Sequence, residues 1–94
     1  LTAFVNNRVK ESKGNSYPTS YLYRRYKGYC EDHGLNTVSQ QKFSQRLKEL
    51  GFGKDRATFR VCSDHGQFKC DEPECSGELM KKRKRCFEGI KLKA

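Results

Sequence analysis

The chain has no tryptophan, only two prolines and one methionine, and no long apolar run. Apolar residues make up 34% of its 94 residues and the mean hydropathy is -0.98, so we expect one small domain with a thin core. Five tyrosines and six phenylalanines can supply much of that core. No stretch reaches membrane-spanning length and no secretory signal is visible, so a membrane partner is not expected.

Catalytic motifs are also missing. The sequence contains no phosphate-binding "GxxxxGK[ST]" loop, no carboxylate cluster and no evident set of acid, base and nucleophile, so an enzyme is not expected. Acidic residues are few: 11 face 20 lysines and arginines, which gives a formal net charge of +9. A domain this small and this basic favours a polyanionic partner such as nucleic acid. Because the chain starts at Leu1 rather than Met, we expect it to be excised from a larger protein.

Three helices are expected in the first half of the chain. Their predicted ranges are residues 1–12, 19–33 and 39–50. Apolar side chains recur every three or four residues in the second helix: Leu22, Tyr26, Tyr29 and Cys30. Thr19 or Ser20 is suited to cap its start and Gly34 to end it, since glycine adopts a left-handed conformation without strain.

The third predicted helix has two different sides. Ser39 is a suitable N-cap, and Phe43, Leu47 and Leu50 are expected to face inward. The outward side then carries polar groups, with Lys42 at its edge: Gln41, Ser44, Gln45 and Lys48. A polar outer side can simply be solvated, but glutamine also suits adenine edges and lysine suits phosphates.

The period of the sequence changes after Gly53. Residues 58–62 and 85–93 are rich in strand formers and predict a hairpin. The long tip between them, residues 63–84, begins acidic and ends in the basic run "KKRKR". We therefore predict one α+β domain, residues 1–94, with the winged helix-turn-helix fold. Three helices (1–53) would be followed by a two-stranded β-wing (54–94) whose tip carries the cysteine-bearing insertion.

This order predicts duplex DNA binding, in preference to single strands. The second helix of a helix-turn-helix lies in the major groove, while basic side chains around it contact phosphates. The predicted DNA-binding residues are Arg24, Lys27, Gln41, Lys42, Ser44, Gln45, Lys48, Lys54, Arg56, Lys81, Lys82, Arg83, Lys84 and Arg85. A protein-docking role for the same domain is the alternative.

Four residues of the tip have the spacing of metal ligands. Cys62, His65, Cys70 and Cys75 are separated by two, four and four residues, and thiolate and imidazole ligands in a tetrahedron suit Zn²⁺. Two alternatives remain open: incidental cysteines in an unstructured insertion, or a disulfide between Cys62 and Cys86. The odd number of cysteines favours reduced thiols in an intracellular, reducing compartment.

The segments "YLYRRYKGYCEDHGLNTVSQQKFSQRLKELGF" and "FEGIKL" resemble the C-terminal winged-helix domain of poxvirus and of phage or plasmid primase-helicases. The matching residues are Tyr23, Tyr26, Cys30, Gly34, Ser39, Phe43, Leu47, Gly51, Gly89, Ile90 and Leu92. The chain is also similar to RFX-type DNA-binding domains, although it lacks their compact basic wing.

The resemblance to primase-helicases implies an accessory DNA-binding domain of a viral or mobile-element replication protein, in host cytoplasm or nucleus. Its partners would be DNA and the parent helicase and primase domains, which carry the catalysis. An RFX-like transcription-factor domain is a further alternative.

Overall fold

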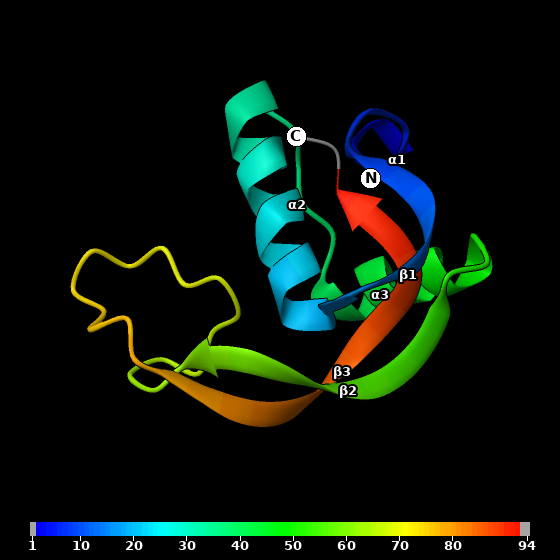
Figure 1. Ribbon diagram of the computed structural model, residues 1–94. Helices are drawn as coiled ribbons and strands as arrows, with labels where there is room; N and C mark the ends of the chain where they lie inside the picture. The colour runs from blue at the N-terminus through cyan, green and yellow to red at the C-terminus, as the bar shows by residue number, and fades with distance from the viewer. Residues whose placement is uncertain (1, 93–94) are drawn as a thin grey trace.

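The computed structural model describes residues 2–92, without the side chains of Thr2 and Lys54. Three helices and three strands alternate along the chain: α1 (Thr2–Arg8), β1 (Val9–Pro18), α2 (Thr19–His33), α3 (Gln40–Glu49), β2 (Gly53–Cys62) and β3 (Leu79–Leu92). The strands form one antiparallel sheet in the order β1–β3–β2, with the helices on one side of it (Figure 1). Leu1, Lys93 and Ala94, at the limits of the predicted domain and of its last strand, lie outside the described residues.

The predicted fold class, three helices followed by a two-stranded wing, is wrong. The sheet has three strands, and β1 lies between α1 and α2 in the sequence. The first helix ends at Arg8 instead of residue 12 because the chain from Val9 onward pairs with β3. Gly14, which suggested a break between helices, lies with φ of 90° where the register between β1 and β3 shifts. A glycine there relieves the strain of a strand irregularity.

The two helices that position the candidate site follow the sequence pattern closely. The range of α2 is the predicted one, and Gly34 ends it with φ of 63°. The Ser39 side chain accepts a hydrogen bond from the backbone N–H of Lys42 and so caps α3. The start of α2 differs from the prediction, because its N-cap residue is Pro18 and no side chain makes a capping hydrogen bond there.

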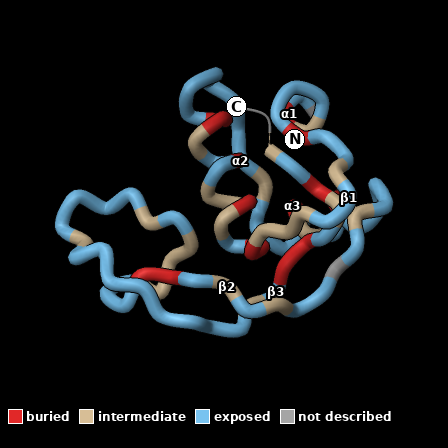
Figure 2. Tube along the Cα trace, viewed as in Figure 1, coloured by how far each residue is buried: buried red, intermediate tan, exposed pale blue. Residues whose placement is uncertain are grey.

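An aromatic core joins the helices to the sheet. Tyr26 and Phe43 are fully buried and stack with ring centroids 5.1 Å apart, and Phe4 of α1 contacts both rings. Phe87 and Ile90 of β3 close the same cluster from the sheet side. Figure 2 shows most buried residues where α2, α3 and the C-terminal half of β3 meet, and a separate buried stretch at the loop end of β2. The predicted inward residues Phe43 and Leu47 are confirmed, whereas Leu50 is 41% exposed.

Two tyrosines of α2 hold the connection to α3. The hydroxyl of Tyr26 accepts a hydrogen bond of 3.0 Å from the backbone N–H of Val38. The hydroxyl of Tyr23 donates one of 2.8 Å to the carbonyl oxygen of the same residue. Both polar groups of Val38 are therefore satisfied by side chains, and the residue just before the N-cap of α3 is fixed against α2.

Strands β2 and β3 pair continuously from Gly53 opposite Glu88 to Cys62 opposite Leu79. The basic run "KKRKR" lies inside β3, so the chain that connects the strands is residues 63–78 and not the predicted 63–84. The loop begins directly after Cys62. This loop therefore connects β2 to β3 at the end of the hairpin that is distant from Gly53 and Glu88.

We predict that removing both tyrosine hydroxyls at Val38 destabilises the fold. In Tyr23→Phe/Tyr26→Phe the polar groups of Val38 lose their partners, which should lower the free energy of unfolding by about 2 kcal/mol. Tyr21→Phe is the control, because its hydroxyl makes no hydrogen bond with any residue in 2–92. Urea denaturation followed by circular dichroism measures both changes, and equal stability of the two variants would contradict the assignment.

Candidate metal centre and nucleic-acid interface

The four predicted metal ligands come together at the end of the hairpin. The ligand atoms of Cys62, His65, Cys70 and Cys75 all lie within 4.8 Å of one another. Cys70 Sγ is 3.7 Å from His65 Nδ1. Cys62 is the last residue of β2 and is buried, while the other three belong to the loop. Spacing in the sequence therefore predicted a real cluster in space, and all five cysteines are free of disulfides.

Backbone N–H groups surround the sulfur of Cys62. Burial on its own raises the pKa of this thiol, but the N–H groups of Gln67 and His65 point at Sγ from 3.4 and 3.3 Å and stabilise the thiolate. Side-chain hydrogen bonds from Cys70 and His65 act in the same direction, and the pKa falls to about 6. Cys62 is thus prepared as an anionic ligand at neutral pH.

The second thiol of the cluster behaves oppositely. The backbone N–H of Glu72 acts to lower the pKa of Cys70, but burial and the neighbouring thiols Cys62 and Cys75 raise it to about 11. Two thiolates this close repel each other unless a cation lies between them. A bound metal ion reverses that preference, because a coordinated thiol is deprotonated outright.

The cluster fits Zn²⁺. Zinc bonds of about 2.3 Å to sulfur and about 2.0 Å to nitrogen place the tetrahedral ligands of a Cys₃His site about 3.5–3.8 Å apart, which is a small contraction of the observed cluster. Three thiolates and one imidazole fill all four positions, the pattern of a structural site rather than a catalytic one. Bound there, zinc would contribute folding free energy to a loop that has little apolar surface of its own.

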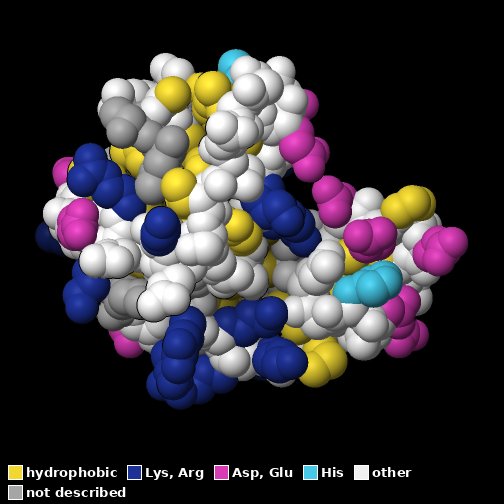
Figure 3. Space-filling view, turned by 180° about the vertical axis from the view of Figure 1, so that it is seen from behind, with side chains coloured by type: hydrophobic (Ala, Val, Ile, Leu, Met, Phe, Trp, Pro, Cys, Tyr) yellow, Lys and Arg dark blue, Asp and Glu magenta, His cyan; other side chains and the backbone are white. Residues whose placement is uncertain are grey.

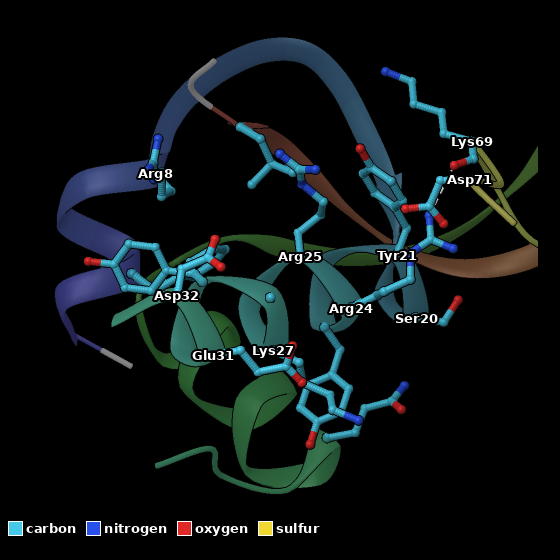
Figure 4. Close-up of a pocket in the computed structure, with 16 residues that line it drawn as sticks. Arg8, Ser20, Tyr21, Arg24, Arg25, Lys27, Glu31, Asp32, Lys69 and Asp71 are labelled. Carbon is cyan, nitrogen blue, oxygen red and sulfur yellow. Dashed lines mark hydrogen bonds between the residues drawn. The ribbon is translucent and has the colours of Figure 1, made fainter. Parts of the chain in front are cut away.

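Arg24 fastens the metal loop to α2. Its guanidinium donates hydrogen bonds of 2.9 Å to Gln67 Oε1, 2.9 Å to the Phe68 carbonyl and 3.2 Å to the Lys69 carbonyl. The group also lies over the ring of Tyr21. Figure 4 shows Arg24 reaching from α2 toward Lys69 and Asp71 of the loop. Arg24 was predicted to contact DNA phosphates, and that role stays a prediction. In this structure its guanidinium donates to the loop instead.

Phe68 is the apolar anchor of the same loop. Its ring packs edge-on against Tyr21, Phe59 and Tyr17, at centroid distances of 5.1, 5.4 and 6.3 Å. Residues of β1, β2 and α2 therefore meet around one loop side chain. This small second cluster adjoins the main core through Tyr17 and fixes the position of the loop.

The outward side of α3 lines a groove of about 790 Å³. Gln41, Ser44, Gln45 and Lys48 lie along one wall, together with Gln40. Lys84 and Arg85 of β3 and Thr19 and Ser20 of α2 complete the lining. The fold thus brings six predicted DNA-binding residues, from two separate elements, around one concave surface.

Most of the remaining predicted cations lie on the hairpin. Arg56 pairs with Arg85, Thr58 with Arg83 and Arg60 with Lys81, and all six side chains are exposed. Residues directly opposite in an antiparallel pair share a face, as do residues two apart in one strand. We call five cations, of which Arg60 was not predicted, the basic hairpin face: Arg56, Arg60, Lys81, Arg83 and Arg85. None of them forms an ion pair with another residue in 2–92. The ion pair found in that range joins Arg46 and Glu49 of α3.

Four predicted residues lie elsewhere. Lys42 is exposed on α3 outside the groove, and Lys82 has its ammonium near Gly66 of the loop. Lys27 lines a different groove of about 840 Å³ on the outer side of α2, where its ammonium lies over the ring of Tyr23 (Figure 4). The side chain of Lys54 is outside the described part of the structure.

Sequence reasoning missed several residues that shape these surfaces. Gln67 and Phe68, which seat the metal loop, carry no pattern that sets them apart from other loop residues. Thr19 and Ser20 were considered only as helix caps, yet both line the groove beside α3. Their position after Pro18, at a helix start that has no other capping group, was the available signal.

Charge is divided between the two ends of the hairpin. Five of the 11 acidic residues lie in the loop: Asp64, Asp71, Glu72, Glu74 and Glu78. Figure 3 shows acidic side chains (magenta) around the protruding loop and Lys and Arg side chains (dark blue) along the lower edge of the molecule. Positive charge therefore gathers at the α3 groove and on the basic hairpin face, and negative charge gathers in the loop.

The fold and site define a small, basic α+β domain with a Cys₃His cluster, and comparison places it in a family. The profile of the family described as Poxvirus D5 protein-like matches residues 1–73, so the chain belongs to this family. The match spans α1 to β2 and ends inside the loop, before Cys75 and β3. No curated protein matches the chain.

Family membership supports a role connected with viral primase-helicases, while the similarity to RFX-type domains stays a prediction. Within residues 2–92 no helix has the length and apolar character needed to span a membrane.

We predict that the chain binds one Zn²⁺ through this cluster. Cys70→Ser and Cys75→Ser should each lose the metal, because serine is a poor zinc ligand and three groups remain. Cys86→Ala is the matched control, since Cys86 is buried in the sheet outside the cluster. Atomic emission after dialysis measures the zinc content per chain of each variant. Equal zinc content in all variants would contradict the site.

Proposed function

We propose that this domain binds duplex DNA and serves as an accessory module of a viral replication protein with helicase and primase activity. The observation that carries the proposal is the groove in which the polar side of α3 meets Lys84 and Arg85 of β3. Gln41 and Gln45 can each offer an amide to a base edge, and the cations at the rim suit the flanking phosphates.

The groove is built on regular elements. Its lining comes from two helices and a strand, α2, α3 and β3, which hold side chains at fixed spacing without a mobile loop. Ser39 caps α3 and Val38 is held by two tyrosines, so the helix that carries Gln41 and Gln45 is fixed against the core. Little reordering of the protein would then be needed on binding.

The basic hairpin face supports the same partner. Directly opposed cations such as Arg56 and Arg85 repel each other across the two strands, and no acidic side chain in residues 2–92 forms an ion pair with them. Phosphates along a DNA backbone would relieve that repulsion and release counterions. Catalysis would belong to other regions of the parent protein.

The first test concerns α3. Gln41→Ala/Gln45→Ala/Lys48→Ala should weaken binding of a fluorescent duplex at least tenfold, as expected when two base contacts and one phosphate contact are removed. Arg46→Ala/Glu49→Ala is the matched control on the same helix, because these residues pair with each other outside the groove. Fluorescence anisotropy measures both variants against duplex and single-stranded DNA. Unchanged affinity of the triple variant would refute the assignment of α3 and favour a protein-docking role.

The second test concerns the hairpin. Removing three phosphate contacts with Lys81→Ala/Arg83→Ala/Arg85→Ala should reduce the slope of log K against log salt by about 2.7, at about 0.9 per contact. Lys10→Ala/Lys13→Ala/Lys91→Ala removes the same charge from exposed positions away from this face and should change the slope far less. Equal slopes in the two variants would mean that net charge alone, and not this face, governs binding.

A further inference from the structure

Thr19 is an exception among the buried polar groups. The residue is 8% exposed, and Oγ1 is the one buried side-chain polar atom in the described residues that lacks a hydrogen-bond partner. A buried hydroxyl without a partner destabilises the free protein unless something else satisfies it. Thr19 lines the groove beside α3, so a ligand in that groove is the available source of a partner.

The helix that starts at Thr19 adds backbone donors to the same place. The first N–H groups of any helix have no partner inside the helix, and α2 has Pro18 at its N-cap with no side-chain cap and no acidic residue in its first turn. The positive end of the dipole of this 15-residue helix is therefore not neutralised by the chain itself. Unpaired N–H groups at a helix start form a ready site for an anion.

Cations surround this helix start. Lys84 and Arg85 of β3 and Lys48 of α3 line the groove together with Thr19 and Ser20, and no acidic side chain lines it. A tetrahedral anion would meet hydroxyl, backbone N–H and cationic donors from three elements. The threonine hydroxyl has two accessible χ1 rotamers in a helix, so rotation about one bond can turn it toward such a ligand.

We propose that the N-terminus of α2 binds a phosphate group through the Thr19 hydroxyl and the free N–H groups of the first turn, with Lys84 and Arg85 beside it. The inference rests on the proposed function in one respect: it assigns the phosphate to a DNA backbone, with α3 reading bases next to it. The groove continues from Thr19 along α3 to Lys48, which suits a phosphate that is part of a chain better than a free ion. In that case α2 positions the duplex and α3 supplies the specific contacts.

The test compares Thr19→Val, which keeps the shape and removes the hydroxyl, with Thr19→Ser, which keeps the hydroxyl. Thr19→Val should weaken duplex binding by about tenfold for any sequence, the effect of one hydrogen bond to a charged group. Thr19→Ser should stay within about twofold of the wild type. Without DNA, Thr19→Val should melt no lower than the wild type, because the lost hydroxyl has no partner in the free protein. Wild-type affinity in Thr19→Val, alongside lost affinity in the α3 triple variant, would overturn this site and leave the proposed function intact.

A second readout judges the phosphate site without DNA. Inorganic phosphate, titrated against chloride at equal ionic strength, should shift the amide NMR signals of Ser20 and Tyr21 in the wild type and shift them less in Thr19→Val. Phosphate-induced shifts in a protein that binds no duplex would overturn the DNA assignment and identify a site for free phosphate. If neither phosphate nor duplex affects these amides, the site is refuted.

Discussion

The central position of β3 is the constraint on which the rest of the molecule depends. This strand pairs with β2 over residues 79–88 and with β1 over residues 86–92, so it joins the two outer strands into one sheet. Its C-terminal half places Phe87 and Ile90 in the aromatic core, and its N-terminal half carries the basic run. One continuous strand therefore fixes the hairpin relative to α2 and α3. The groove at Lys84 and Arg85 lies where these halves meet, so its geometry follows from core packing.

Three features around that groove are unfavourable for an isolated protein. Arginines oppose each other across the hairpin, α2 starts without a cap, and the Thr19 hydroxyl is buried without a partner. Sequences that specify a fold well tend to break such local rules at functional sites. All three are relieved by negative charge, which gives a common physical reason for a phosphate-bearing partner.

The predictable parts of the structure are those with strong local signals. The range of α2 follows from its apolar repeat and from Gly34, and α3 follows from Ser39 and its inward Phe43 and Leu47. Strand β1 could not be read in the same way. Its residues are mostly polar, contain Gly14 and end in Pro18, and they become a strand only because β3 offers a partner. Pairing between residues 68 to 83 positions apart leaves no local trace in a single sequence.

The candidate site also has parts that could be predicted from local sequence and parts that could not. Ligand spacing was enough to find the metal cluster, because four ligand residues within 14 positions of one short loop can readily meet around a tetrahedral ion. The outward side of α3 was likewise set by its inward residues. The role of Arg24 was not accessible from sequence, since a surface arginine on a basic helix has the same appearance whether it binds a phosphate or a loop carbonyl.

Arg24 also decides which side of α2 is free for a polyanion. Its donors are directed at Gln67, Phe68 and Lys69, and this attachment holds the acidic loop beside the outer groove of α2. Acidic side chains there repel a nucleic acid, even though several cations line that groove as well. The groove at α3 has no acidic residue in its lining. Under the proposed function, the attachment of the metal loop through Arg24 therefore favours the α3 side for phosphate. The metal centre would then influence where a polyanion binds without contacting it.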